Sequence, residues 1–308
     1  MKQIAFALAR VALKAKVLFV AVFAIAMASM AHAAEPINVL RGGPVGAGVG
    51  LWAEAVADTL RENGREAQIV GLQDCRQVSK WIQSNPGKPY TFMTYSDYAL
   101  LDELKPDHPA ACGYKVDASN LVTITGRWWH FICGKKNEND SLAYLKTNDG
   151  LKIGVWNHPV GYTVLQQQMK KLGTSAKVIG FASGKQMLTA FNTGDIDYIV
   201  LSSENLVGSL KNPSCFATAA DTYTAKAHMP DRVSYDQVES MPFLNYGLWP
   251  MIAAGGGVNV ELLRAEFATR PSKTYKDLVS YLVPETKPVN QQLADLNETA
   301  LRLKGLIQ

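Results

Sequence analysis

Short apolar runs rich in β-branched and aromatic residues alternate with longer amphipathic stretches along most of the 308-residue chain. Runs of this kind are typical of buried strands, and the stretches between them have the period of amphipathic helices. The alternation predicts an α/β fold made of βαβ units, with mostly parallel strands. Strands are expected at residues 37–41, 67–72, 90–94, 152–156, 177–181 and 198–201. Helices are expected at residues 50–63, 75–83, 162–172 and 185–193, with another that begins near Tyr98.

The pattern occurs twice, and extended segments separate its two halves. Residues 121–133 form a long β-rich run that Gly126 interrupts, and residues 215–219 have the composition of a second crossing. Two similar α/β halves joined in this way predict two lobes with a cleft between them. Each lobe is expected to be a mixed, mostly parallel sheet flanked by helices. The expected boundaries are residues 34–133 plus 215–308 for lobe 1 and residues 134–214 for lobe 2.

The remaining C-terminal part repeats the same composition, with a β-rich run at residues 246–253. Helices are expected after it at residues 260–269, 275–282 and from 289 toward the end. In the first helix of the chain, residues 50–63, we expect Leu51, Ala55 and Leu60 to face the interior.

The first 33 residues have the features of a cleaved signal peptide. An apolar run at residues 17–28 precedes the small-x-small sequence Ala31-His32-Ala33, where a peptidase would cut. The alternative is an uncleaved membrane anchor, although the apolar run is short for a bilayer span. We therefore expect export to the periplasm. The positively charged residues before the apolar run are Lys2, Arg10, Lys14 and Lys16.

Removal of this leader makes the chain formally neutral. The whole chain has 31 Lys and Arg and 27 Asp and Glu; four of the basic residues lie in the leader, so 27 of each sign remain. Nucleic-acid binding depends on clustered positive charge, and the remaining sequence has no run of Lys and Arg. The sequence therefore predicts no nucleic-acid partner.

Four cysteines follow the leader, at Cys75, Cys112, Cys133 and Cys215. In an oxidising compartment they permit three pairings. We expect Cys75–Cys112 and Cys133–Cys215, because the expected strands place the second pair on neighbouring strands between the lobes. Free buried thiols are the alternative. No C-x-x-C or H-x-x-x-H spacing accompanies them, so no metal site is predicted.

A glycine-rich turn, Arg-Gly-Gly-Pro-Val-Gly-Ala-Gly-Val-Gly at residues 41–50, joins the first expected strand to the first helix. Glycines let the backbone approach a ligand closely, and a helix start offers unpaired N–H groups and a positive dipole end. These features favour a cradle for a carboxylate. The same turn fits the G-x-G-x-x-A dinucleotide pattern at residues 48–53, with Asp74 as the ribose-binding acid. A purely structural turn is the third interpretation.

Three further turns join strand ends to helix starts and contain polar residues. Ligands of open α/β sheets collect at the carboxyl ends of the strands, so we expect these turns to bind ligand together. Lys185 is the obvious cation among them. The alternative is that Ser96, Asn157 and Ser183 only cap helices. The candidate ligand-binding residues are Gly43, Val45, Gly46, Ala47, Gly48, Thr94, Tyr95, Ser96, Asn157, Gly161, Tyr162, Thr163, Ser183, Gly184 and Lys185.

Sequence patterns typical of enzymes are missing. The chain has no G-x-S-x-G elbow, no H-E-x-x-H and no P-loop, and its five histidines are scattered. His158 is the one histidine in a candidate turn; we expect it to be exposed there, with a ligand hydrogen bond as the alternative. Trp128 and Trp129 are expected to pack at the hinge, with cleft lining as the alternative. The sequence predicts a binding protein without catalytic residues or a cofactor.

Taken in order, the motifs resemble those of the tripartite tricarboxylate transporter receptors, the TctC or Bug family of periplasmic binding proteins. The turn at residues 41–48 is similar in kind to the Pro/Gly-rich turn that ends the family's first strand. Residues 184–197 resemble its stretch between a Lys-Gly loop and a Gly-Gln-Val-Asp turn. Residues 229–239 resemble its Leu-Pro-Asp-Val-Pro-Thr-Leu-Ala-Glu segment, and residues 246–254 resemble the Gly-Trp-Phe-Gly-Leu-Phe-Ala-Pro-Ala that follows.

The resemblance implies a two-lobed, type II periplasmic binding fold that closes on a small carboxylate. It implies delivery of that ligand to the membrane permease subunits of a tripartite transporter by a monomeric receptor. By position, residues 43–48 and 94–96 would contact the ligand from one lobe, and Asn157, 161–163 and 183–185 from the other.

The chain departs from the family in two ways, and both leave the ligand open. Gly-Leu-Gln-Asp-Cys at residues 71–75 replaces the family's second Gly-rich segment, and paired cysteines are not a general family feature. Receptors of TAXI-type TRAP transporters have a similar Gly-rich start and are the near alternative. An exported enzyme on the same two-lobed scaffold and a sensor that binds without transport are the others.

Overall fold

The structure is a computed structural model of the full chain. The expected signal peptide, residues 1–33, lies outside the described residues, as do Gly46, Ala47 and most of the 229–239 motif. The side chains of Trp128 and Trp129 also lie outside the description, so their placement at the hinge stays a prediction. The described residues are 35–43, 45, 48–129, 131–135, 141–201, 213–218, 239–240, 247–280, 282–284 and 287–306.

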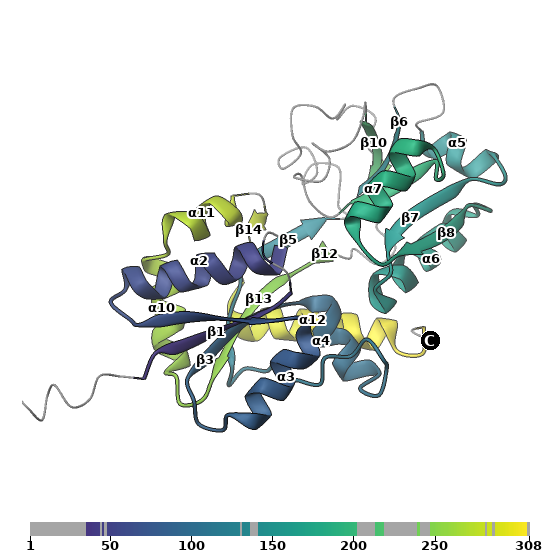
Figure 1. The fold of residues 1–308 in the computed structure, drawn as a ribbon. Coiled ribbons are helices and arrows are strands. Elements are labelled where there is room, and N and C mark those ends of the chain that lie inside the picture. Colours follow the sequence, from purple (N-terminus) through teal and green to yellow (C-terminus); the bar gives the residue numbers. More distant parts are fainter. Residues whose placement is uncertain are drawn as a thin grey trace, which may run out of the picture. The chain divides into compact units, whose positions relative to one another are not determined.

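Five strands form the first sheet, in the order β2 (Ala67–Leu72), β1 (Ile37–Gly42), β3 (Tyr90–Tyr95), β13 (Pro250–Gly255) and β4 (Leu121–Ile124) (Figure 1). β1 pairs in parallel with β2 and β3, whereas β13 runs antiparallel to β3 and β4. The parallel pairing follows from the crossover helices between these strands, which return the chain to the same end of the sheet. The carboxyl ends of β1, β2 and β3 therefore lie at one edge.

Helices cover both faces of this sheet (Figure 1). α2 (Gly48–Glu62), α10 (Val260–Thr269) and α11 (Lys273–Val279) pack on one face; α3 (Cys75–Ser84), α4 (Ser96–Leu104) and α12 (Val289–Leu303) pack on the other. Strand β13 shows how the sequence divides the faces. Ile252 and Ala254 pack with α2, α10 and α11, while Met251 packs with α4 and α12. Alternate side chains of a strand point to opposite faces, so one apolar run serves two cores.

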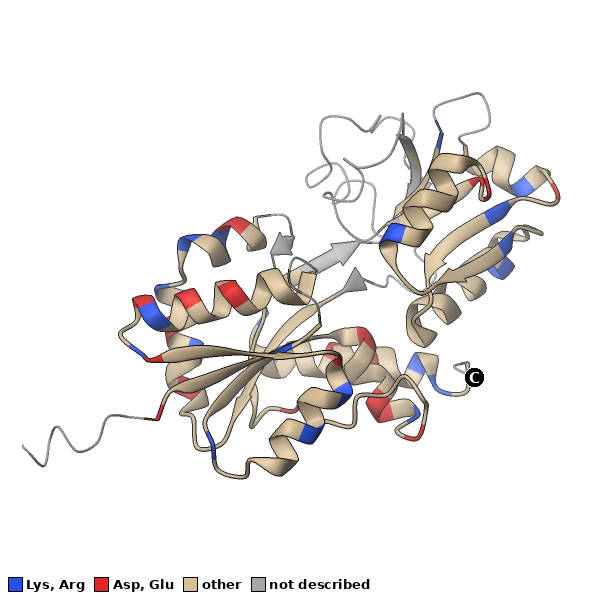
Figure 2. Cartoon of the chain, viewed as in Figure 1, with Lys and Arg blue, Asp and Glu red and all other residues tan. Residues whose placement is uncertain are grey.

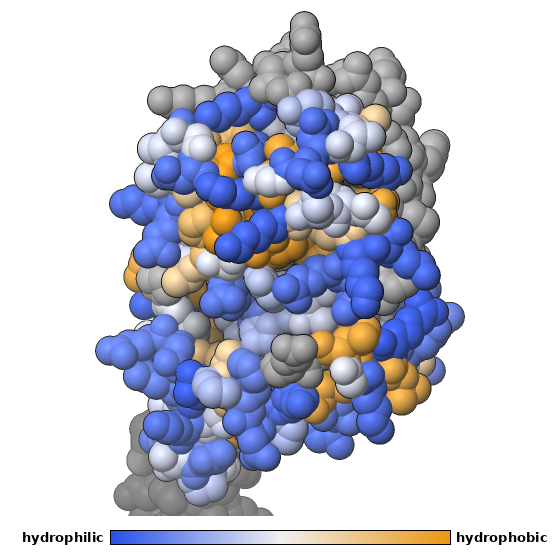
Figure 3. Space-filling view, turned by 90° about the vertical axis from the view of Figure 1, so that its right-hand side faces the viewer, coloured by the Kyte–Doolittle hydropathy of each residue, from blue (hydrophilic) through white to orange (hydrophobic). Residues whose placement is uncertain are grey.

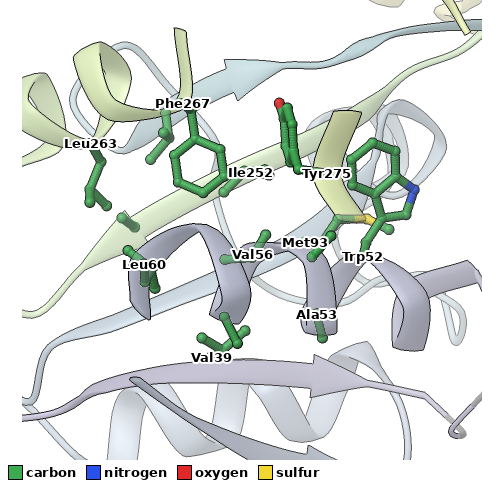
Figure 4. Close-up of a cluster of buried hydrophobic side chains, with 14 of the residues drawn as sticks. Val39, Trp52, Ala53, Val56, Leu60, Met93, Ile252, Leu263, Phe267 and Tyr275 are labelled. Atoms are coloured by element: carbon green, nitrogen blue, oxygen red, sulfur yellow. The ribbon is translucent and has the colours of Figure 1, made fainter. Parts of the chain in front are cut away.

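The core between α2, α10 and α11 is built around Trp52 (Figure 4). Trp52 is 1% exposed, and its ring meets Tyr275 edge-on with centroids 5.7 Å apart. The inner stripe of α2 is Trp52, Val56 and Leu60, at helical spacing. The expectation that Leu51 faces the interior is wrong, because Leu51 is 43% exposed. It directly precedes Trp52 in the sequence and therefore lies beside the buried stripe on the helix.

We expect Trp52→Ala to lower the free energy of unfolding by about 3–5 kcal/mol, because a large cavity would replace a fully buried ring. The neighbouring substitution Leu51→Ala is the control and should cost under about 1 kcal/mol, since that side chain is exposed. Guanidinium unfolding followed by circular dichroism measures both. Equal losses in the two variants would contradict this account of the α2 face.

Six strands form the second sheet, in the order β11 (Glu239–Ser240), β10 (Pro213–Thr218), β6 (Phe131–Lys135), β9 (Tyr198–Leu201), β7 (Lys152–Trp156) and β8 (Lys177–Phe181). β7 pairs in parallel with β8 and β9, and β6 runs antiparallel to β9 and β10. α6 (Pro159–Leu172) joins β7 to β8, and α7 (Gly184–Thr193) joins β8 to β9. Both sheets are therefore mixed and flanked by helices, as the sequence predicts.

One short helix of this part is missing from the sequence-based expectation. α5 (Leu142–Thr147) has six residues, which is too short for apolar periodicity to be visible. Ser141 caps it, because the Tyr144 N–H donates to the Ser141 hydroxyl oxygen at 3.0 Å. Leu145 then packs with Ile153 of β7 in the core of the second sheet.

The β-rich run expected at residues 121–133 is three strands in three sheets. β4 belongs to the first sheet and β6 to the second, and β5 (Gly126–Trp129) lies between them in the sequence. β5 pairs antiparallel with β12 (Gly247–Leu248) and β14 (Val283–Pro284) in a small third sheet. The boundaries of the two lobes stay a prediction.

Disulfides join Cys75 to Cys112 and Cys133 to Cys215, which is the pairing preferred from the sequence. Cys133 of β6 and Cys215 of β10 are register partners in an antiparallel pair. The other bond links the start of α3 to the segment after α4. Two disulfides fit a protein of an oxidising compartment.

Candidate functional site

The predicted turns follow β1, β3, β7 and β8, and each connects the strand to a helix. In the first turn, Gly43 is buried, Val45 is 74% exposed and Gly48 begins α2. Gly48 lies against the end of β3, because a Cβ at this position would stand 2.6 Å from the Tyr95 hydroxyl oxygen. Only glycine allows this close approach of the first turn to the second.

The second turn has buried polar residues, and part of its chemistry is used by the fold. The Tyr114 hydroxyl donates to the Thr94 hydroxyl oxygen in a short hydrogen bond. The Ser96 N–H donates to the Trp249 carbonyl at 2.9 Å, and the Trp249 N–H donates to the Ser96 hydroxyl oxygen at 3.1 Å. Ser96 is the first residue of α4, and the N-cap residue is Tyr95. The alternative that Ser96 caps this helix is therefore wrong.

The third turn carries Asn157 and His158 between β7 and α6. Asn157 is exposed, and its backbone N–H donates to the Phe181 carbonyl at 2.8 Å. His158 is the N-cap residue of α6 but makes no side-chain cap hydrogen bond. It is 3% exposed, so the expectation of an exposed loop histidine is wrong. The ring is covered because the start of α4 packs against it.

The remaining candidates divide into capping and free groups. Ser183 is a helix cap, since the Gln186 N–H donates to its hydroxyl oxygen at 3.3 Å. Thr163 is buried in α6, and the Tyr162 hydroxyl donates to the Val178 carbonyl at 3.3 Å. Lys185 is exposed at the start of α7, and the described residues offer it no ion-pair partner. Lys185 is therefore the predicted residue whose positive charge remains available to a ligand.

The second and third turns meet where α4 begins beside α6. Asp97 Oδ2 lies 3.5 Å from His158 Nδ1, and both side chains are almost fully buried. The Tyr98 ring packs edge-on against His158, with centroids 4.7 Å apart, and against Trp156 at 6.0 Å. The structure thus brings together turns from the two large sheets, although no sequence pattern singles out Asp97, Tyr98 or Trp156 as contacts.

The buried pair has strongly altered acidity. Burial raises the pKa of Asp97 from 3.8 to about 8. Burial, together with the nearby His108, lowers the pKa of His158 from 6.5 to about 3. Burial also raises the pKa of Tyr98 to about 12, with smaller contributions from Asp97 and Asp74. Around neutral pH the Asp97–His158 pair therefore holds one proton and no net charge.

Arg41 is a functional candidate that the sequence analysis missed. It lies at the end of β1, its Nε is buried, and the described residues offer that atom no hydrogen-bond partner. The guanidinium extends over Gly71 of β2, where a Cβ would stand 2.7 Å from Nη2. The available signal was a lone cation directly before the glycine-rich turn, with a glycine on the neighbouring strand to make room for it.

In the structure, the acid that the dinucleotide interpretation requires has another role. The Asp74 side chain caps α3, because Oδ1 accepts the Gln77 N–H at 2.9 Å. A capping carboxylate at the start of a ten-residue helix is already used by that helix. Within the described ranges, no three His, Cys, Asp or Glu side chains gather in a way that could hold a metal ion.

A cavity of about 330 Å³ lies away from these turns, between α4, α12 and the segment after α4. Leu100, Val116 and Leu296 contribute apolar walls, and Asp102 is a polar one. None of the predicted ligand-binding residues that the structure describes lines it. For the part of the chain that the structure describes, no helix combines the length and apolar character needed to cross a membrane.

Comparisons with known proteins give a likeness of fold without a likeness of sequence. No protein-family model matches the chain, and no curated protein matches it in sequence. Solved structures match nearly the whole chain. MatC from Rhodopseudomonas palustris, with bound malate, superposes with a TM-score of 0.62 at 14% identity, over 90% of this chain and 100% of that one.

Two more structures agree with this match. A TctC solute-binding protein from Polaromonas gives a TM-score of 0.62 at 16% identity, over 90% of this chain and 99% of that one. An R. palustris protein with adipate gives 0.62 at 13% identity, over 89% and 96%. The chain has the type II periplasmic binding fold. The predicted resemblance to TctC and Bug proteins is confirmed for that fold.

Because Gly48 lies so close to Tyr95, the effects of substitutions at these two positions on the free energy of unfolding should be coupled. We expect Gly48→Ala to lower the free energy of unfolding by about 1–2 kcal/mol, because the methyl group would overlap the Tyr95 hydroxyl. In a Tyr95→Phe background the nearest ring carbon is 3.9 Å away, so the same substitution should cost less than half as much. Urea unfolding of the four proteins measures the coupling; equal costs in both backgrounds would refute the contact.

The buried pair should also make stability depend on pH. With ordinary pKa values of 3.8 and 6.5, the unfolded pair holds one proton between those values and none above 6.5, whereas the folded pair keeps one proton up to about pH 8. The folded state therefore binds the extra proton between pH 6.5 and 8, and its stability falls as pH rises through that window.

We expect this fall to be about 2 kcal/mol, since one proton over 1.5 pH units is involved. Between pH 4 and 6.5 both states hold one proton, and the contribution of the pair should be constant. The double variant Asp97→Asn/His158→Gln is the control and should lack the fall. Unfolding free energies at pH 5, 6.5 and 8 measure it; parallel curves for the two proteins would contradict the buried pair.

Proposed function

We propose that the protein is a periplasmic solute-binding receptor that captures a small carboxylate and delivers it to a membrane transporter. Capture would occur by closure of the two lobes on the ligand, each lobe supplying part of the hydrogen bonds. The ligand would be an organic acid or an amino acid. No chemical step is part of this function.

The fold supports this class of function. Structures with the same fold were solved with malate in MatC and with adipate in a second R. palustris protein. Another match is the periplasmic binding protein BugD, at a TM-score of 0.59. A fold by itself leaves the ligand open, so the choice of a carboxylate rests on this chain's own residues.

The observation that carries the proposal is the unneutralised positive character of the turns. Arg41 ends β1 beside the glycine-rich start of α2, and its buried Nε has no hydrogen-bond partner within the described part of the chain. Lys185 stands at the start of α7 without an ion-pair partner among the described residues. Helix starts attract anions, and a guanidinium matches a carboxylate in two parallel hydrogen bonds. Together these groups favour an acid over a neutral ligand.

Location and partner follow from the same proposal. The leader-like residues 1–33 and the two disulfides support export to the periplasm. The partners would be the permease subunits of a tripartite transporter, with the receptor as a monomer. Figure 2 shows Lys and Arg interspersed with Asp and Glu over the described helices. On the face in Figure 3, apolar side chains form small patches between hydrophilic ones, as on ordinary monomer surfaces.

The test is a thermal-shift screen of carboxylates, followed by calorimetry on the hits. A ligand that binds the folded state raises the apparent melting temperature by mass action. We expect Arg41→Gln and Lys185→Ala to weaken binding of a hit by about tenfold or more, as removal of a charged hydrogen-bond donor does.

The matched controls are Arg270→Gln and Lys177→Ala, two exposed cations away from these turns, and both should bind as the wild type does. Mass spectrometry of any acid that co-purifies gives an independent result. If no carboxylate binds, or if the controls lose as much affinity as the two site variants, the proposed function is wrong.

A further inference from the structure

The carboxyl group of Asp97 stands between the starts of two helices. Asp97 is the second residue of α4, and its Oδ2 lies 3.4 Å from the position of a Cβ on Gly161, in the first turn of α6. The same oxygen lies 3.5 Å from Nδ1 of His158, the N-cap residue of α6. Asp97 is 2% exposed and His158 is 3% exposed.

This carboxyl group occupies the place where α6 would attract an anion. α6 has no capping side chain of its own: His158 makes no cap hydrogen bond, and Pro159 has no N–H to donate. The free N–H groups and the dipole of a helix start favour a negative or acidic group nearby. In this protein the chain itself supplies that group.

Three atoms of the pair keep unused hydrogen-bonding capacity. Asp97 Oδ1 and both ring nitrogens of His158 are buried and have no hydrogen-bond partner among the described residues. Buried polar groups in proteins are nearly always hydrogen-bonded. In this structure these atoms are closed off from solvent, so a guest group would reach them only by displacing the Asp97 or His158 side chain.

The surroundings of the pair are aromatic. The His158 ring lies tilted against Trp156, with centroids 5.1 Å apart, and Tyr98 packs edge-on against both. Tyr98 and Trp156 are half-buried, so part of each ring is available to a ligand. Such rings favour the apolar body of a ligand over a second charged end.

We propose that Asp97 is a specificity-determining residue that makes this site select monocarboxylates with an apolar or aromatic body over dicarboxylates. The inference rests on the proposed function and names its ligand class. The single carboxylate of the guest goes to Arg41 and the turns around it. Asp97 occupies the position beside the start of α6 where the second carboxylate of a diacid would have to bind.

The selectivity has two physical sources. The ionised second carboxylate of a diacid would be buried beside a pair that carries no net charge at neutral pH, and an unpaired buried charge is strongly unfavourable. A protonated Asp97 still fills the space beside Gly161 at the start of α6. A diacid must therefore displace a buried side chain or leave its second charge unpaired, and either requirement discriminates against it.

The experiment compares hexanoate with adipate, which have the same six-carbon chain and differ by one carboxylate. Calorimetry at pH 7 should show wild-type protein binding hexanoate at least about tenfold more tightly than adipate. Asp97→Ser frees the start of α6 and should reduce that preference to less than about threefold. Benzoate against terephthalate provides the same comparison with an aromatic body.

Two further variants keep the test decisive. Asp97→Asn preserves the shape and removes the acid, so its preference should lie between those of the wild type and Asp97→Ser; thermal unfolding shows that each variant is folded. Asp107→Ser removes an exposed carboxylate and should keep the wild-type preference.

Equal binding of hexanoate and adipate by the wild type, or an unchanged preference in both Asp97 variants, overturns the inference. A wild-type protein that binds malate or other carboxylates without this preference leaves the receptor function standing, whereas binding of no carboxylate contradicts both.

Discussion

The contact between the starts of α4 and α6 is the constraint on which the candidate site depends. It joins a turn of the five-stranded sheet to a turn of the six-stranded sheet through Asp97 and His158. Two ionisable groups in such a dry environment can remain together only if their shared charge stays near zero. Burial achieves this by shifting both pKa values toward the neutral forms. The same burial removes water from the place where two helix starts converge.

The likeness to solved receptors at 13–16% identity shows what such a fold requires of its sequence. It requires apolar runs of strand length, amphipathic helices between them and turns that let strand ends meet helix starts. Many sequences satisfy these conditions, which explains why no family model matches while the fold is shared. Ligand specificity depends on a few side chains on the turns and is independent of these conditions for the fold.

Sequence reasoning located the turns better than the roles of their side chains. Gly48 was singled out for close approach of the backbone to a ligand, and the structure shows it close to the Tyr95 hydroxyl. The ligand-binding roles of Gly48 and Lys185 stay predictions. Ser183 follows the capping alternative, while Ser96 is engaged by Trp249 across the sheet. Arg41 and Asp97 were passed over, because burial and the lack of a partner are properties of the folded chain. Neither burial nor the lack of a partner can be read from residue type or spacing.

The sequence by itself determined the alternation of strands and helices and the positions of the turns between them, and it favoured the observed cysteine pairing among three. The alternation follows from local periodicity, which a single chain displays directly. Only the tertiary structure decided that the turn after β3 meets the turn after β7, and that His158 is covered there by α4. Contacts between segments some sixty residues apart depend on how whole sheets and helices pack. Packing of that kind is a property of the assembled core, and no local pattern encodes it.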